Sequence, residues 1–130
     1  MTDQLISFDT AKLAKEKGFF DKNIYGEVRL SQPKFYDVDG LLHSIEDVFN
    51  DDNIKVSNCY NAPTQSLLQK WLRDIHKINI TIGADTSGDT NEYYVELQVD
   101  FDKNIELGWR LSYEAALEDG LKYALQEALK

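Results

Sequence analysis

The sequence contains little cysteine, histidine or proline: one Cys, two His and two Pro in 130 residues. Cys59 has no second cysteine with which to form a disulfide inside the chain, and Met1-Thr-Asp-Gln begins no charged-then-apolar signal segment. We therefore expect a cytoplasmic protein rather than a disulfide-stabilised secreted one. No apolar run approaches the roughly 18 to 20 residues that span a bilayer, so we expect neither an integral membrane protein nor a membrane partner.

The same scarcity limits the catalytic and metal-binding chemistry that the chain can offer. His43, His76 and Cys59 are too few and too scattered to predict a zinc site. Ser66 or Cys59 would need a histidine beside it to act as a nucleophile, and neither lies in a signature such as Gly-x-Ser-x-Gly. Gly83 is interpreted as a turn glycine, because no phosphate-binding loop surrounds it. The sequence predicts no catalytic residue, no metal and no cofactor.

One short stretch has part of the spacing of a calcium loop. Asp37-Val-Asp-Gly40 followed by Glu46 would fill several ligand positions, but the first position would fall on Phe35, whose side chain has no oxygen. An Asp-Gly hairpin turn explains the same residues more simply. We therefore predict a hairpin that pairs residues 35–38 with residues 41–44.

The sequence contains enough apolar residues for one core. Hydrophobic residues make up 42% of the chain, including seven Tyr, six Phe and two Trp, which excludes intrinsic disorder as the main state. A chain of this length fits one domain, so we expect a single domain over residues 1–130.

Acidic residues are concentrated in the second half of the chain. Residues 1–77 carry 12 acids and 10 bases, whereas residues 78–130 carry 11 acids and four bases. Between Asp85 and Asp119 there are ten carboxylates against the two bases Lys103 and Arg110. This excess argues against direct nucleic-acid binding by the second half and favours a basic partner.

Hydrophobic periodicity predicts the helices and strands. A first helix is expected over residues 6–18, capped by Ser7, and a last helix from Ser112, with small residues at every fourth position: Ala116, Gly120, Ala124 and Ala128. Alternation predicts strands 78–82 and 92–102, and the segments 24–30 and 34–37 are also strand-like. The pattern predicts an α+β two-layer sandwich, an antiparallel sheet of four to five strands with three helices on one face.

The best-specified helix is expected over residues 61–77, with Pro63 in its first turn and Asn61 or Ala62 as its cap. Its apolar stripe should pack on the sheet with Trp71 at the centre; the stripe consists of Leu67, Leu68, Trp71, Leu72 and Ile75. The polar side is a candidate contact for a small anion, a nucleic acid or the acidic half of the chain, and consists of Gln65, Gln69, Lys70, Arg73, His76 and Lys77. An ordinary solvated face explains the same residues.

The solvent side of strand 92–102 is the second candidate surface. Its outward carboxylates are Glu92, Glu96, Asp100 and Asp102. Outward residues two apart on a strand are separated by about 6.8 Å, similar to successive phosphates of a nucleic acid, so these carboxylates could imitate a phosphate row. Glu92, Glu96 and Asp100 would also be the first residues to test if the chain were an enzyme with a carboxylate site. A simply solvated strand accounts for the pattern as well.

Three stretches resemble a family of short uncharacterised proteins encoded by phages and prophages: residues 7–19, residues 62–73 with His76, and residues 113–122. The most specific is Ala-Pro-Thr-Gln-Ser-Leu-Leu-Gln-Lys-Trp-Leu-Arg. The resemblance implies an origin in a mobile element and the cytoplasm of a bacterial host as location, and it implies no catalytic residue. We expect a non-enzymatic accessory protein that binds another protein, from host or phage, or a second copy of itself. An acidic DNA mimic that inhibits a host DNA-binding protein and a small carboxylate enzyme are the alternatives.

Overall fold

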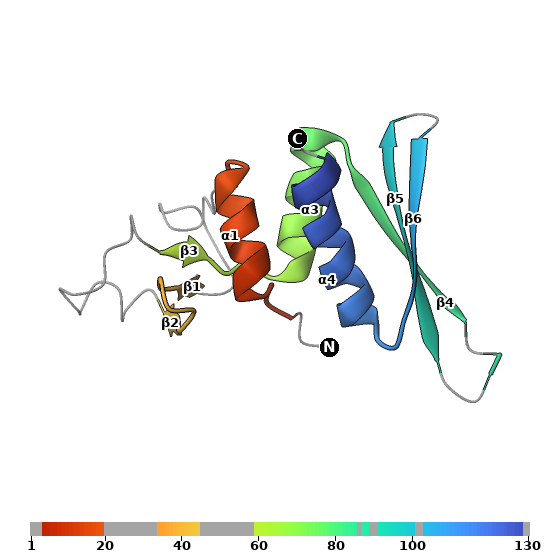
Figure 1. Ribbon diagram of the computed structural model, residues 1–130, viewed down its shortest axis with the longest axis horizontal. Helices are drawn as coiled ribbons and strands as arrows, with labels where there is room; N and C mark the ends of the chain where they lie inside the picture. Colours follow the sequence, from red (N-terminus) through yellow and green to blue (C-terminus); the bar gives the residue numbers. More distant parts are fainter. Residues whose placement is uncertain are drawn as a thin grey trace. The chain divides into compact units, whose positions relative to one another are not determined.

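A computed structural model describes residues 4–19, 34–44, 59–85, 87–88, 91–100 and 103–128 (Figure 1). The chain divides into two compact units, one formed by Met1–Gln4 with Thr64–Lys130 and the other by Leu5–Pro63. Each unit contains its own antiparallel sheet of three strands. The single domain expected for residues 1–130 stays a prediction.

In the unit formed mainly by residues 64–130, two helices lie on one side of a sheet (Figure 1). The strands β4 (Asn79–Asp85), β5 (Glu92–Asp100) and β6 (Lys103–Arg110) are hydrogen-bonded in the order β4-β5-β6. Helix α4 (Tyr113–Tyr123) packs on all three strands and continues into one turn of π-helix, η3 (Ala124–Ala128). Helix α3 (Gln65–His76) packs on α4 and β4. No described helix of this unit lies on the other side of the sheet.

The core of this unit lies between its helices and its sheet. The prediction of a small-residue ridge on the last helix is confirmed, because Ala116, Gly120 and Ala124 are all buried. Small side chains let a helix backbone come close to the strands beneath it. The large buried side chains of the unit are Leu68, Leu72, Ile78, Ile80, Val95, Leu97, Leu117, Leu121 and Leu125.

The predicted apolar stripe of α3 is only partly right. Leu68 and Leu72 are buried as expected, but Trp71 is half-buried and Ile75 is 63% exposed. Gln65, which the sequence analysis assigned to the polar side, is buried instead. The buried face of α3 is rotated toward Gln65. The amide of Gln65 hydrogen-bonds to polar groups of α4, so its burial does not leave it without hydrogen-bond partners.

Helix α3 begins later than predicted. Thr64 is the N-cap, in extended conformation, and its hydroxyl accepts a hydrogen bond from the N–H of Leu67. Neither Asn61 nor Ala62 caps the helix: a proline disfavours helical conformation in the residue before it, so Pro63 keeps Ala62 outside. Threonine is a favoured N-cap residue, so the helix begins after Thr64.

The alternation predicted for β5 is confirmed at its centre. Val95 and Leu97 are buried on the helix side, while Gln98 is exposed. Tyr93 is half-buried and meets Tyr113 of α4 edge-on, with the ring centroids 6.3 Å apart. The predicted strand also included Phe101 and Asp102, which lie outside the described residues.

The unit of residues 5–63 combines one helix with short strands. Helix α1 (Phe8–Glu16) is capped by Ser7, as predicted, and packs against β3 (Tyr60–Asn61). The Tyr36 hydroxyl donates a hydrogen bond of 2.6 Å to the carbonyl of Ile6, which precedes the helix. The buried side chains of the unit include Ile6, Thr10, Ala11, Ala14, Phe19, Phe35, Cys59 and Ala62.

The predicted Asp-Gly hairpin is confirmed. Strands β1 (Lys34–Tyr36) and β2 (Leu42–Ser44) pair antiparallel across a turn in which Gly40 has a φ of +88°. The carboxylate of Asp37 is occupied by the turn, since its Oδ1 accepts hydrogen bonds from the N–H groups of Asp39 and Leu41. The predicted strand 24–30, and Glu46 of the calcium-like spacing, lie outside the described residues.

The α+β class and the antiparallel pairing are confirmed, whereas a single sheet of four to five strands with three helices on one face is not. The described strands form two sheets, β2-β1-β3 and β4-β5-β6, and α1 belongs to the unit of the first sheet. Alternation along one strand indicates which side chains are buried but not which distant strand is its neighbour. Strand β6 was also not predicted.

Candidate protein-interaction surface

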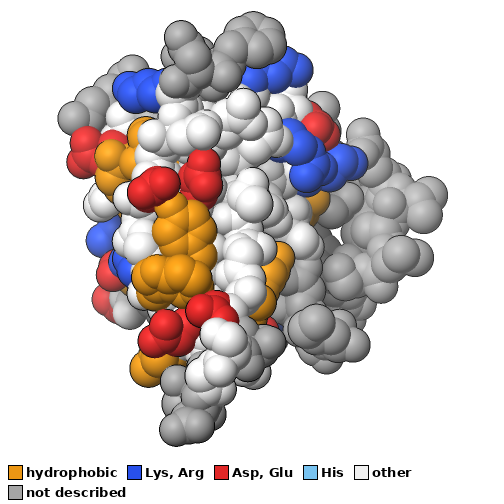
Figure 2. Space-filling model, turned by 90° about the vertical axis from the view of Figure 1, so that its right-hand side faces the viewer, with side chains coloured by type: hydrophobic (Ala, Val, Ile, Leu, Met, Phe, Trp, Pro, Cys, Tyr) orange, Lys and Arg blue, Asp and Glu red, His pale blue; other side chains and the backbone are white. Residues whose placement is uncertain are grey.

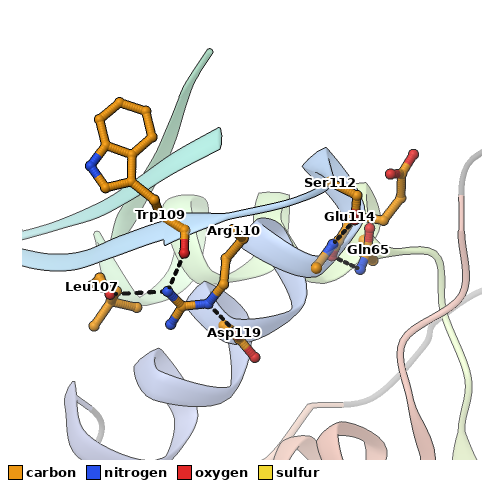
Figure 3. A network of polar contacts seen from close by, with 8 residues as sticks. Gln65, Leu107, Trp109, Arg110, Ser112, Glu114 and Asp119 are labelled. Atoms are coloured by element: carbon orange, nitrogen blue, oxygen red, sulfur yellow. Dashed lines mark hydrogen bonds and ion pairs between the residues drawn. The ribbon is translucent and has the colours of Figure 1, made fainter. Parts of the chain in front are cut away.

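An aromatic pair occupies the open side of the β4-β5-β6 sheet. In the register of the sheet, Tyr94 of β5 lies opposite Trp109 of β6 and opposite Gly83 of β4. The rings of Tyr94 and Trp109 are tilted by 56°, with centroids 5.2 Å apart. Trp109 is 49% exposed, and Figure 3 shows its side chain pointing away from α4. A large apolar surface is thus presented to the outside of this unit.

Arg110, next in the chain, points to the opposite side of the sheet (Figure 3). Its Nε donates a hydrogen bond of 2.5 Å to Oδ2 of Asp119 on α4, and its Nη1 donates to the carbonyls of Leu107 and Trp109. These contacts hold Arg110 against the helix, so its positive charge does not reach the face that carries Trp109.

Two pairs of carboxylates border the aromatic pair. Glu96, two residues along β5 from Tyr94, lies opposite Glu106 of β6. Glu92, two residues along in the other direction, lies opposite Asp85 of β4. Figure 2 shows hydrophobic side chains between acidic ones on the side of the molecule where this sheet lies. We call these six residues the aromatic–acidic face: Asp85, Glu92, Tyr94, Glu96, Glu106 and Trp109.

A β-bulge brings Glu106 and Trp109 to the same side of the sheet. The register shifts between Val95 and Glu96, whose partners on β6 are Gly108 and Glu106, so Leu107 is the extra residue. Gly108 has a φ of +96°, a conformation that glycine adopts without strain. Strict alternation would have placed Glu106 and Trp109 on opposite sides, so a period-two pattern does not indicate that they share a face, and strand β6 itself was not predicted.

The hydroxyl of Tyr94 stays protonated on this face. Desolvation, a hydrogen bond to the Glu106 side chain and the negative charges of Glu106 and Glu96 raise the pKa of Tyr94 to about 12. The hydroxyl is therefore a hydrogen-bond donor to Glu106 at neutral pH, and this bond helps to fix the orientation of the ring.

Gly83 leaves an open space beside Tyr94. It lies within β4, not in a turn as interpreted from the sequence, and a Cβ atom built on it would meet nothing within 4 Å. A glycine inside a strand often marks a close approach by another group. Tyr94 thus has Trp109 opposite it on β6 and, on β4, the open position over Gly83, which we call the notch.

The structure does not gather the candidate residues of α3 into one binding face. Gln65 is buried, and its Nε2 donates to the carbonyl of Glu114 at 3.0 Å (Figure 3) and to Oε1 of Glu118 at 2.9 Å. Gln69 donates through Nε2 to the carbonyl of Ile80 at 2.9 Å. Both amides join α3 to its neighbours within the unit, so they act structurally.

The basic residues of α3 are exposed, as predicted, but have local contacts. Arg73 lies 3.5 Å from the Asp74 carboxylate, and Lys77 donates to the Asp74 carbonyl at 3.1 Å, while Lys70 is exposed beside them. His76 is half-buried, and its ring meets Trp71 edge-on with centroids 4.6 Å apart. These residues give a solvated basic edge of the helix.

The predicted acidic row is assembled in part. Glu92 and Glu96 flank Tyr94, as their spacing indicated, while Asp100 ends β5 opposite Lys103. Asp102 lies outside the described residues. Asp85 and Glu106 complete the row from neighbouring strands, and only the cross-strand register could have identified them.

The described settings of Cys59 and His43 do not favour nucleophilic catalysis. Burial raises the pKa of the Cys59 thiol, which favours the unreactive protonated form. His43 is held by Asp37, with Nε2 and Oδ2 2.8 Å apart, across the β1–β2 hairpin. Ser66 is exposed on α3. In the part of the chain that the structure describes, no group of three or more His, Cys, Asp or Glu is placed to hold a metal ion.

Among the described residues, no helix combines the length and the apolar character needed to cross a membrane. Compared with protein-family models, curated proteins and solved structures, the chain has no match.

Proposed function

We propose that this chain is a non-enzymatic protein that acts by binding another protein through the aromatic–acidic face. The observation that carries the proposal is Trp109, half-exposed on the edge strand β6 beside Tyr94 of the central strand β5, with a carboxylate pair on either side of Tyr94 along the strands. Tryptophan and tyrosine supply much of the binding energy in protein interfaces, typically at the centre of a polar rim. The face has this arrangement.

The resemblance of residues 62–73 to phage and prophage proteins indicates which partners to test first. We propose a host or phage protein of the bacterial cytoplasm, with a second copy of the chain as the other candidate. The acidic border favours a partner whose matching surface is basic, since complementary charges guide association and exclude wrong partners.

Affinity capture from bacterial lysate, with and without phage infection, tests the proposal. The wild-type chain should retain a protein that Trp109→Ala loses, because the substitution removes the more exposed ring of the aromatic pair. Leu111→Ala is the matched control, since Leu111 is 78% exposed and close in sequence but is no member of the face. Equal capture by all three proteins would refute the proposed surface.

DNA mimicry is the second candidate, favoured by Glu92, Glu96, Asp85 and Glu106 on one face. A mimic should lose its partner in the double substitution Glu96→Lys with Asp100→Lys, and duplex DNA should displace the partner. The aromatic pair interrupts the row of charges, which favours the general protein-binding function over the mimic. Capture that excess duplex does not displace would decide against mimicry.

A carboxylate enzyme would use the same residues differently. Glu92, Glu96 and Asp100 would have to hold a metal or transfer protons to a small substrate. Thermal unfolding with and without divalent metals separates this alternative, because a ligand that binds only the folded state raises the melting temperature.

A further inference from the structure

We expect the two carboxylate pairs of the aromatic–acidic face to destabilise the folded protein. Glu96 lies directly opposite Glu106, and Asp85 directly opposite Glu92, on neighbouring strands. Residues in such positions have Cβ atoms about 4.5 to 5.5 Å apart, and like charges there destabilise a sheet. Hydrogen bonding of Asp85 to Ser87 lowers the pKa of Asp85, so this carboxylate is charged at neutral pH.

The strands themselves do not neutralise this charge. Over the described strands β4, β5 and β6 the sequence contains two bases, Lys103 and Arg110. Arg110 points to α4 and pairs with Asp119, and Lys103 lies opposite Asp100 at the far end of β5. The four carboxylates thus surround the aromatic pair without a counter-charge from these strands.

We propose that the aromatic–acidic face binds an arginine side chain in a basic segment of the partner protein, with the guanidinium seated over Gly83 against the ring of Tyr94. This inference rests on the proposed function and specifies the chemistry of its partner. A guanidinium stacks on aromatic rings and presents several N–H groups to carboxylates, which a compact ammonium cannot do with the same geometry. The face offers both kinds of contact within one short stretch of sheet.

The proposed position of the guanidinium is the notch over Gly83. The absence of a side chain leaves the flank of Tyr94 open, since an added Cβ would meet nothing within 4 Å. Glu92 and Glu96 lie diagonally on either side of Gly83, two residues from Tyr94 along β5. Diagonal neighbours across a sheet are about 7 to 8 Å apart, within reach of long side chains. An arginine in the notch would therefore have carboxylates on two sides and an aromatic ring on a third.

Binding of short labelled peptides to the full chain, followed by fluorescence anisotropy, tests the inference. The probes are three peptides of equal length in a Gly-Ser background that differ at two positions, carrying Arg, Lys or Glu. The Arg peptide should bind most tightly, the Lys peptide several-fold more weakly and the Glu peptide not at all. Glu96→Gln should weaken binding of the Arg peptide by about tenfold, the scale of a desolvated ion pair or cation–π contact.

Two substitutions make the test specific to the notch. Gly83→Leu should fill the notch and lower the affinity for the Arg peptide by about tenfold or more. Gly83→Ala provides a smaller change in the same place if the leucine variant does not fold. Glu127→Gln is the matched control, because it removes one exposed carboxylate from η3, outside the face. It should change the affinity by less than about twofold, the effect of a distant screened charge.

The possible results separate this inference from the proposed function. Equal loss of affinity in Glu96→Gln and Glu127→Gln, or no effect of Gly83→Leu, would show general charge attraction and overturn the arginine site. If no peptide binds but lysate capture still depends on Trp109, the arginine site is wrong and the protein-binding function stands. If lysate capture does not depend on Trp109, the proposed function itself fails.

Discussion

Gly120 of α4 lies so close to Ile80 of β4 that a methyl group added to the glycine would be 2.9 Å from Cγ2 of Ile80. The same methyl group would be 3.1 Å from Cγ2 of Val95 on β5. Real Cβ atoms essentially never lie within 3.0 Å of another atom, and 3.1 Å is already a tight contact, so the missing side chain of Gly120 sets the separation between helix and sheet in this unit.

Gly120→Ala should therefore destabilise the protein. Alanine favours a helix over glycine by about 1 kcal/mol, but overpacking a core typically costs about 1 to 3 kcal/mol, so the packing term is expected to dominate. Urea unfolding of both proteins measures the difference. A variant about 1 kcal/mol more stable than the wild type would mean that the close contact does not exist.

The rotation of α3 can be tested with three alanine substitutions. Leu72→Ala should cost about 2 to 5 kcal/mol, because Leu72 is fully buried. Ile75→Ala should change stability by less than about 0.5 kcal/mol, since Ile75 is mostly exposed. Trp71→Ala should fall between the two rather than cost the most. Chemical denaturation gives the order. The largest effect for Trp71→Ala, together with a substantial effect for Ile75→Ala, would restore the stripe expected from the sequence.

Gln65→Glu should be strongly destabilising at neutral pH. The amide Nε2 of Gln65 donates to the Glu114 carbonyl and the Glu118 carboxylate, and a glutamate would place an acceptor against both. A buried polar group left without its partners costs about 1 to 3 kcal/mol, and more when it is charged. Part of the stability should return at about pH 4, near the ordinary pKa of a glutamate. Gln126→Glu, at an exposed position, is the control and should have little effect.

The sequence was most informative where a feature depends on neighbouring residues. The Ser7 cap, the Asp-Gly hairpin and the alternation around Val95 and Leu97 are local patterns, and all three are present. The small-residue ridge containing Gly120 is local in the same sense, because it follows from positions four apart on one helix.

The candidate surface depended on information that is not local. Glu92 and Glu96 were predicted to be outward, but their partners Asp85 and Glu106 follow only from the pairing of strands. The extra residue Leu107 reverses the side on which Glu106 lies relative to Trp109, which no period-two pattern reproduces. For Gln65 the polar partners that permit burial come from another helix, so its own sequence neighbours could not indicate them.

Acid should weaken the contribution of Asp37 to the β1–β2 hairpin. The hydrogen bond from His43, followed by those from the N–H groups of Leu41 and Asp39, lowers the pKa of Asp37 below its usual value. A carboxylate with a lowered pKa stabilises the fold at pH values above its unfolded pKa, and this stabilisation is lost as the pH falls through the folded value. The difference in unfolding free energy between wild type and Asp37→Asn should therefore be larger at pH 5 than at pH 3. Asp39→Asn replaces only the side chain of Asp39 and leaves its N–H group in place. The difference in unfolding free energy between this variant and the wild type should therefore change less between the two pH values.

Glu96 and Glu106 carry like charges on neighbouring strands. We therefore expect Glu96→Gln, the substitution that should weaken binding of the Arg peptide, to make the folded protein more stable than the wild type. Glu96→Gln removes one of two carboxylates that face each other across β5 and β6, and cross-strand charge effects are about 0.2 to 1 kcal/mol. The gain should shrink in 1 M salt, where charges are screened within about 3 Å. Glu127→Gln should give no comparable gain, which separates relief of this pair from a general reduction of negative charge. If Glu96→Gln is instead less stable in low salt, the two carboxylates do not repel each other in the folded protein, and their repulsion gives no reason to expect a cationic partner.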